Sequence, residues 1–316
     1  MKKLLLFLTI SFVFIGCNKK DEIVDPVIKN GKNEFTTIVD DVEREYIVSI
    51  PESYDGKSDV PVVFMLHGTG GDGERFYNTS GWKELGEKEN FISVFPSSMN
   101  YCILDEDGQK KITKWNSIPF CSFEYCSNVT PPDDIKFLRQ IIDELGKEYT
   151  IDSKRIYFVG FSNGGQMCVK LSILMGDKIA AIVESGALFD LDTMSNPVRK
   201  LPILFQIGNG DYGPANTGPF IPLSEFDKVL SSAEYQPYKI VQTHIKSFDL
   251  NPNYTISGDT NTVVYATFVP NDGNTTNNFN FAYIKDLTHQ YPNGKNHWMI
   301  GAQVNWNWLK QFTLPN

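Results

Sequence analysis

Histidine is scarce in this chain of 316 residues, which contains four of them. They are His67, His244, His289 and His297. Their wide scatter does not match the close ligand spacing of a zinc motif. We therefore expect no metal and no other cofactor. A histidine that acts as a catalytic base must be one of these four.

Positive charge is also in short supply. The chain has 29 Lys and Arg residues against 38 Asp and Glu residues, a formal net charge of −9 at pH 7. Such a surface repels nucleic acid, and neither a basic patch nor a nucleic-acid-recognition motif is present. Nucleic acid is therefore not an expected partner.

Apolar runs long enough to span a bilayer are absent. The longest run follows Met1-Lys2-Lys3 and covers residues 4–15, against about 20 residues for a spanning helix. A short basic segment followed by such a run is typical of a signal peptide. It ends in Phe14-Ile15-Gly16-Cys17, which resembles a lipoprotein processing site. We expect removal of residues 1–16 and lipidation of Cys17 as a membrane anchor, with a plain secretory signal as the alternative.

The polar residues 17–33 then read as the lipidated cysteine and a flexible tether. Residues 34–316 suit one large domain. The expected location is a bacterial membrane, facing the periplasm or the cell surface. Charged residues 19–22 hint at outward display, but any soluble linker carries such charge.

Four cysteines remain after Cys17. They are Cys102, Cys121, Cys126 and Cys168. Export permits disulfides, and the first three share one irregular stretch, so we expect one bridge among them. Cys168 falls at a helical position and is expected to be a buried apolar residue. The sequence does not choose between the possible pairings.

Apolar strand-like segments alternate with helix-like segments along the chain. The strand-like segments are 46–51, 61–66, 91–95, 156–161, 179–184, 203–207 and 279–285, and the helical ones include 131–147, 166–175 and 301–312. Thr130 is the expected cap of the first of these helices, and residues 270–278 read as a surface turn. The alternation predicts an α/β fold, a mostly parallel central sheet with helices on both faces.

The pentapeptide Gly160-Phe161-Ser162-Asn163-Gly164 lies between one of these strands and a helix. In a nucleophile elbow the chain turns sharply from strand to helix, and glycines on either side of the serine avoid steric collisions. The pentapeptide alone is a weak signal, and its flanking elements supply the specificity. Ser162 is therefore the candidate nucleophile.

A serine nucleophile needs a base and an acid, which follow it in chain order in this arrangement. His289 lies directly after the strand-like segment 279–285 and is the favoured base, whereas His297 is expected to cap or rim the site. Asp211 follows segment 203–207 at the sheet edge where such folds place their chemistry. Asp190 and Asp192 are the reserve candidates for the acid.

The segment 67–73 is dense in glycine and follows the strand-like segment 61–66. No lysine follows, so it is not a phosphate-binding loop. At this position, backbone N–H groups of Thr69 and Asn163 would form the oxyanion hole. The alternative is a simple tight turn. His67 is expected to brace this loop and to lie among the substrate-binding residues.

Several segments in order resemble the secreted polyhydroxybutyrate depolymerase and feruloyl esterase family of α/β-hydrolases. The matching pieces are 44–51, 62–68, 115–116, 133–138, 159–167 and 288–294. The resemblance implies an α/β-hydrolase fold with Ser162, Asp211 and His289 as the triad, and it places Trp115 and Asn116 near the substrate entrance. Tyr291, another expected substrate-binding residue, stands where the family usually has Trp.

These features predict a secreted serine esterase that forms an acyl-enzyme. The expected substrates are feruloyl or acetyl esters on plant polysaccharide, or a hydroxyalkanoate polyester. The aromatic residues Trp115, Phe120, Phe123 and Tyr125 fit either substrate contact or ordinary core packing. A serine peptidase of the same fold and a non-catalytic, glycan-binding surface lipoprotein are the alternatives.

Overall fold

A computed structural model describes residues 29–215, 218–273 and 276–315. The expected signal peptide at 1–16 and the expected lipidation site Cys17 lie outside these residues. Over the described ranges, no helix has both the length and the apolar character needed to cross a membrane.

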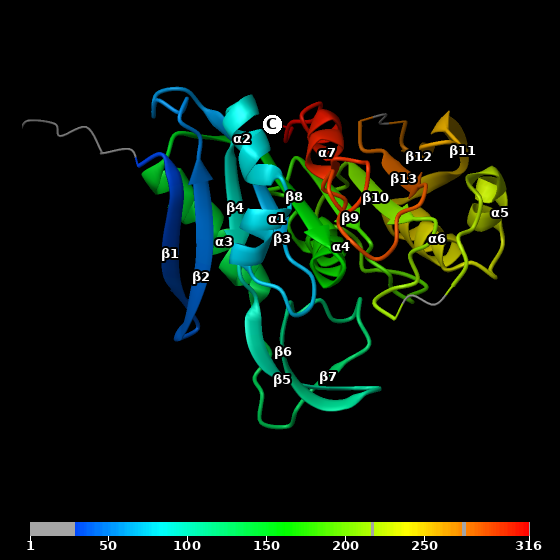
Figure 1. Cartoon of the computed structure of the whole chain (residues 1–316), viewed down its shortest axis with the longest axis horizontal. Helices are drawn as coiled ribbons and strands as arrows, with labels where there is room; N and C mark the ends of the chain where they lie inside the picture. The colour runs from blue at the N-terminus through cyan, green and yellow to red at the C-terminus, as the bar shows by residue number, and fades with distance from the viewer. Residues whose placement is uncertain (1–28, 216–217, 274–275, 316) are drawn as a thin grey trace, which may run out of the picture.

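A ten-stranded sheet forms the centre of the molecule, in the order β1-β2-β4-β3-β8-β9-β10-β13-β12-β11 (Figure 1). The six strands from β4 to β13 in this order are parallel, and the strands outside them pair antiparallel. The bounds are β1 Gly31–Val39, β2 Val42–Ile50, β3 Val60–Leu66, β4 Ile92–Pro96, β8 Ile151–Phe161, β9 Ala181–Ser185, β10 Ile203–Gly208, β11 Leu250–Asp259, β12 Val263–Pro270 and β13 Phe279–Ile284.

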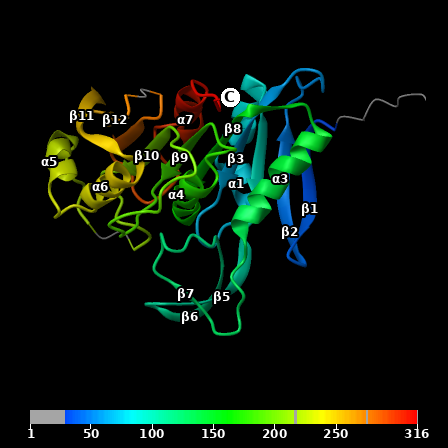
Figure 2. The same cartoon turned by 180° about the vertical axis from the view of Figure 1, so that it is seen from behind.

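Helices cover both faces of this sheet, because side chains on the central strands alternate between two apolar layers. Val62 and Phe64 of β3 belong to one buried cluster, and Val63 and Met65 belong to the other. Helices α3 (Asp134–Glu148), α4 (Asn163–Leu174), α5 (Phe226–Ser231) and α6 (Gln236–Phe248) pack on the first layer. Helices α1 (Gly73–Thr79), α2 (Trp82–Glu89) and α7 (Gly301–Leu309) pack on the second, as the two opposite views show (Figures 1 and 2). The predicted α/β fold is confirmed.

The central strands are covered on both sides. Every residue of β3, β4, β9 and β10 is buried, which explains their nearly continuous apolar sequences. Between β10 and α5 lies the short 3-10 helix η1 (Leu223–Glu225).

The first strand and helix α3 differ from the sequence-based expectations at their starts. Strand β1 begins at Gly31, so residues 31–33 belong to the folded domain and not to the tether. Helix α3 begins at Asp134, and its cap is the Asp133 carboxylate, which accepts the Lys136 N–H at 2.9 Å. Thr130 does not cap it, because Pro131 precedes Pro132 and a residue before proline disfavours helical geometry, so the helix does not begin at Pro131.

A second, three-stranded sheet lies beside the carboxyl ends of the central strands. Its strands are β5 (Met99–Asp105), β6 (Gly108–Lys114) and β7 (Glu124–Tyr125), in the order β6-β5-β7. We call residues 99–126 the arm, which projects from the main body (Figure 1). The stretch expected to be irregular therefore contains an antiparallel sheet.

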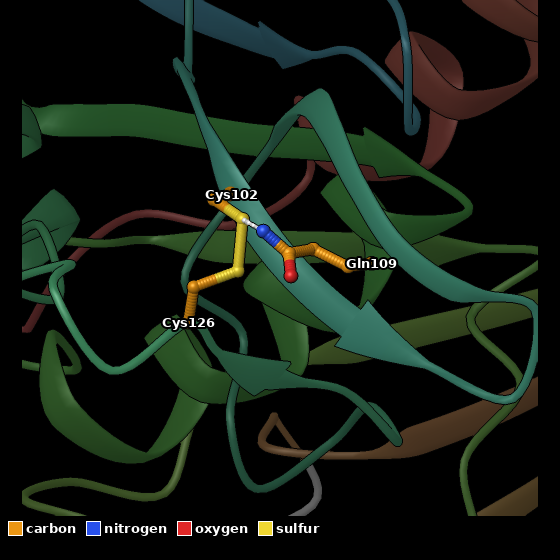
Figure 3. Close-up of a disulfide and its surroundings, with 3 residues drawn as sticks. All are labelled: Cys102, Gln109 and Cys126. Carbon is orange, nitrogen blue, oxygen red and sulfur yellow. Dashed lines mark hydrogen bonds between the residues drawn. A yellow bond between two sulfur atoms is a disulfide. The ribbon is translucent and has the colours of Figure 1, made fainter.

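One disulfide joins the two ends of the arm, between Cys102 and Cys126 (Figure 3). It falls among the three cysteines where one bridge was expected. Cys121 is a free, half-buried thiol and Cys168 is a free, buried one. Burial raises the pKa of both thiols, so neither is an activated nucleophile.

Candidate active site

Ser162 stands at the sharp turn between β8 and α4. Its backbone has φ 55° and ψ −119°, a strained conformation for a residue with a side chain. A Cβ at Gly160 would lie 2.1 Å from the Gly164 carbonyl oxygen, and one at Gly164 would lie 2.4 Å from that of Leu66. Both glycines of the pentapeptide are therefore required sterically, and the turn presents Ser162 at the carboxyl edge of the sheet.

Three side chains from distant segments meet at this edge. The His289 Nε2 atom lies 2.8 Å from the Ser162 hydroxyl oxygen, and its Nδ1 atom lies 2.8 Å from a carboxylate oxygen of Asp211. Ser162 follows β8, Asp211 follows β10, and His289 follows β13. The structure thus brings together the three residues that the sequence predicts as nucleophile, acid and base.

The Asp211 carboxylate is held in one orientation. The oxygen that faces His289 also accepts the Gly213 backbone N–H at 2.9 Å, and the side chain is 2% exposed. A carboxylate at Nδ1 requires the imidazole proton on Nδ1. Nε2 is then free to accept the Ser162 hydroxyl proton.

The reserve candidates lie elsewhere. Asp190 and Asp192 are exposed and pair with Lys239. His297 contacts the Lys285 carbonyl oxygen through Nε2 at 2.9 Å, and its Nδ1 accepts the Met299 N–H at 3.2 Å. It supports the loop that carries His289 and is not part of the site.

The expected oxyanion donors lie close to the nucleophile. Asn163 follows Ser162 directly, and Thr69 follows Gly68, where an added Cβ would lie 3.2 Å from the Ser162 Cβ. Within the described part of the chain, the backbone N–H groups of Thr69 and Asn163 donate to no protein acceptor. Both are therefore available to an oxygen bound beside Ser162.

His67 is not a substrate-binding residue, contrary to expectation, because it is 0% exposed. Its Nδ1 donates to the Gly68 carbonyl oxygen at 2.8 Å, and its Nε2 accepts the Ser98 N–H at 3.0 Å. Burial lowers the pKa of His67 to about 4. The neutral ring braces the glycine-dense loop.

Trp115 and Asn116 also hold structure together instead of lining the entrance. Trp115 is 0% exposed, and its indole N–H donates to the His67 carbonyl oxygen at 2.9 Å. The Asn163 side chain accepts the Trp115 N–H at 2.7 Å and donates to its carbonyl oxygen at 3.3 Å. Asn116 donates its N–H to Asp134 and accepts from Lys170, both at 2.7 Å.

Tyr291 borders the site, but its hydroxyl faces away into the core. That hydroxyl accepts from the Trp82 indole at 2.9 Å and from the Asn305 amide at 3.2 Å, and burial raises its pKa. It forms a wall and offers no polar group to a substrate.

A pocket of about 350 Å³ adjoins His289. It is lined by Gly68, Thr69, Gly71, Arg75, Phe76, Thr79, Ser80, Phe161, His289, Gln290, Tyr291, Asn293 and Asn296. The Phe161 ring packs against His289 with centroids 5.0 Å apart. The roles of Phe161 and Arg75 were not anticipated, although the position before the serine is a signal for a residue that touches the base. Among the described residues, no cluster of His, Cys, Asp and Glu could hold a metal ion.

Curated proteins with similar sequences are esterases. The chain is 27% identical over 151 residues to the bifunctional acetylxylan esterase/xylanase XynS20E of Neocallimastix patriciarum, which is 48% of this chain and 19% of that protein. It is 28% identical over 174 residues to feruloyl esterase B of Piromyces equi, which is 53% of this chain and 29% of that protein. The chain thus spans less than a third of the length of either relative.

Solved structures share the fold at low sequence identity. An acetyl xylan esterase from Aspergillus awamori superposes with a TM-score of 0.58 at 13% identity, over 88% of this chain and 99% of that one. The poly(3-hydroxybutyrate) depolymerase LpqC of Bordetella parapertussis gives 0.51 at 13% identity, over 91% and 92%. At such identity the likeness shows the α/β-hydrolase fold. The family model for phospholipases and carboxylesterases matches residues 52–212, about half of the chain, so the chain belongs to the phospholipase/carboxylesterase family.

Proposed function

We propose that this protein is a serine carboxylic-ester hydrolase that works through an acyl-enzyme. The observation that carries the proposal is the hydrogen-bonded series Ser162–His289–Asp211, with both contacts at 2.8 Å, at a strained strand-to-helix turn. A serine hydroxyl beside a correctly oriented imidazole is the arrangement that acyl transfer requires. Family membership supports the same reaction.

In the first half of the reaction, Ser162 Oγ attacks the ester carbonyl carbon while His289 Nε2 takes its proton. The negative charge moves to the carbonyl oxygen, which the Thr69 and Asn163 N–H groups stabilise. Asp211 stabilises the imidazolium. When the intermediate collapses, the bond to the alcohol oxygen breaks, and His289 returns the proton to that oxygen.

In the second half, water replaces the alcohol. His289 takes a proton from the water as its oxygen attacks the acyl carbon, and the same two N–H groups again hold the oxyanion. Collapse breaks the bond to Ser162 Oγ, and the proton on His289 restores the hydroxyl. A carboxylic acid leaves.

For the substrate, we propose feruloyl or acetyl esters on plant polysaccharide, with hydroxyalkanoate polyesters as the second choice. Relatives named as feruloyl esterase and acetylxylan esterase favour the first, and the fold of a polyester depolymerase supports the second. We further propose export as a lipoprotein anchored through Cys17. The Cys102–Cys126 disulfide favours an oxidising compartment.

A panel of acetyl, feruloyl and hydroxybutyrate esters, together with a peptide amide, tests the reaction and the class of substrate. We expect Ser162→Ala to lower kcat/KM for the preferred ester by at least about 10⁴-fold and Asp211→Asn by about 10⁴-fold. Asp190→Asn is the matched control, because this exposed carboxylate pairs with Lys239, and it should match the wild type.

Other results would refute the proposal. Preferred cleavage of the amide would indicate a peptidase. If a fluorophosphonate probe fails to label Ser162 and Ser162→Ala changes no rate, the protein is a non-catalytic binding protein.

A further inference from the structure

The pocket beside His289 contains one permanently charged side chain, Arg75 of α1, and no carboxylate. Arg75 is exposed. Its backbone N–H donates to the Asp72 side chain at 2.7 Å. Its guanidinium, however, forms no ion pair or hydrogen bond with any group in the described ranges.

This lack of a partner sets Arg75 apart from the other arginines of the chain. Arg44, Arg139 and Arg155 each pair with an aspartate. Arg199 donates to three carbonyl oxygens, those of Gly176, Ile179 and Lys200. In a chain with a net charge of −9, a free guanidinium in a pocket that lacks carboxylates is positioned to bind an anion.

The pocket lies on the alcohol side of the ester. This step rests on the proposed function, in which His289 returns a proton to the departing alcohol oxygen, so the alcohol must lie next to His289. The same loop supplies Gln290, Asn293 and Asn296 to the pocket wall. The Asn293 amide donates to the Thr79 carbonyl oxygen of α1 at 2.9 Å, which ties this loop to the helix that carries Arg75.

We propose that Arg75 binds a carboxylate on the alcohol part of the ester, so that the substrate is an ester of an acidic sugar such as a uronic acid unit. A guanidinium presents a planar set of donors that matches a carboxylate in a bidentate geometry. Arg75 is thus a specificity-determining residue for the alcohol and takes no part in the bond changes.

The test compares matched aryl acetates that differ only in charge on the alcohol. The probes are 3- and 4-acetoxybenzoate and the corresponding acetoxybenzamides, and the measured quantity is the ratio of kcat/KM for the acid to that for its amide. We expect the wild type to favour at least one acid and Arg75→Gln to lower that ratio about tenfold or more. Arg75→Lys should keep part of the preference, and added salt should weaken it in the wild type.

Arg139→Gln is the control, because it removes the same charge from α3, where Arg139 pairs with Asp177. It should leave the ratio unchanged. An unchanged ratio in Arg75→Gln, with both probes still hydrolysed, would overturn the role of Arg75 while the esterase function stands. Hydrolysis of no ester by the wild type would overturn the proposed function, and the role of Arg75 with it.

Discussion

Ser162 occupies a backbone conformation that costs about 1–3 kcal/mol. The close packing of the turn enforces this conformation. Gly160 and Gly164 lie so near other backbone atoms that a Cβ at either position would not fit. The Ser162 N–H also donates to the Ser185 carbonyl oxygen at 2.8 Å. The surrounding fold therefore holds the strain and keeps the hydroxyl beside His289.

Residue identities at the site were predictable to different degrees. Ser162, Asp211 and His289 were identifiable because each follows a strand whose apolar sequence marks the sheet edge. The expected substrate contacts at His67 and Trp115 are wrong because proximity to a motif does not reveal which way a side chain faces. Both side chains turn into the core, where the His67 ring accepts the Ser98 N–H and the Trp115 indole donates to the His67 carbonyl oxygen.

His67 makes the stability of the protein depend on pH. Its pKa of about 4 in the folded state lies below the usual 6.5. Between these two values the unfolded chain binds a proton that the folded chain lacks. The free energy of unfolding therefore has its full value above pH 6.5 and decreases as pH falls towards 4. At pH 5 the decrease is about 2 kcal/mol.

Urea unfolding at pH 7.5 and pH 5 measures this loss. His67→Gln lacks the titrating ring, so its free energy of unfolding should change less between the two pH values than that of the wild type. Equal changes in the two proteins would contradict the assignment of this pH dependence to His67.

At the scale of elements, the parallel strands were the most predictable, because burial on both faces demands continuous apolar sequence. β11 was not predictable, since every one of its residues after Leu250 is exposed or partly exposed. The strands of the arm were missed for a similar reason: β6 has no buried residue. In such strands the backbone pairing alone defines the structure, and the sequence carries little signal for it.

Arg44 of β2 and Asp134 of α3 form a buried ion pair at 2.7 Å, with side chains 2% and 1% exposed. Arg44 also lies over the Phe137 ring at 4.0 Å. Removing one partner leaves a buried, uncompensated charge. Burial already raises the pKa of Asp134 against the opposing effect of Arg44.

We therefore expect Arg44→Ala to lower the free energy of unfolding by about 3–5 kcal/mol. Arg139→Ala removes an exposed pair with Asp177 and should cost no more than about 1 kcal/mol. Urea denaturation curves of the two variants provide the comparison. Similar decreases in the free energy of unfolding of the two variants would show that burial does not make the Arg44–Asp134 pair more important for stability than the exposed pair.

At the scale of the whole molecule, residues in the middle of the arm hydrogen-bond the central body. The Gly70 N–H donates to the Thr113 carbonyl oxygen at 2.8 Å, and the Asn163 side chain holds Trp115. The disulfide closes the arm on itself across 24 positions of the sequence. The single bridge was expected, but its partners were not determined, because pairing depends on the antiparallel register of β5 with β7.

Cross-linking a loop of this length stabilises a fold by about 3 kcal/mol. Replacing both Cys102 and Cys126 with Ala should lower the urea midpoint by a corresponding amount, and a reductant should do the same to the wild type. Cys121→Ser is the control, because it leaves the bridge intact and should keep the response to reductant. A wild-type midpoint insensitive to reductant would contradict a stabilising role for the bridge.

Asn163 links two parts of the protein with a single residue. Its main chain follows the nucleophile, and its side-chain amide hydrogen-bonds Trp115 and Ser117 in the middle of the arm. The arm and the nucleophile therefore cannot shift independently. A ligand that displaces the arm therefore also displaces, through the Asn163 side chain, the backbone that positions the Ser162 hydroxyl.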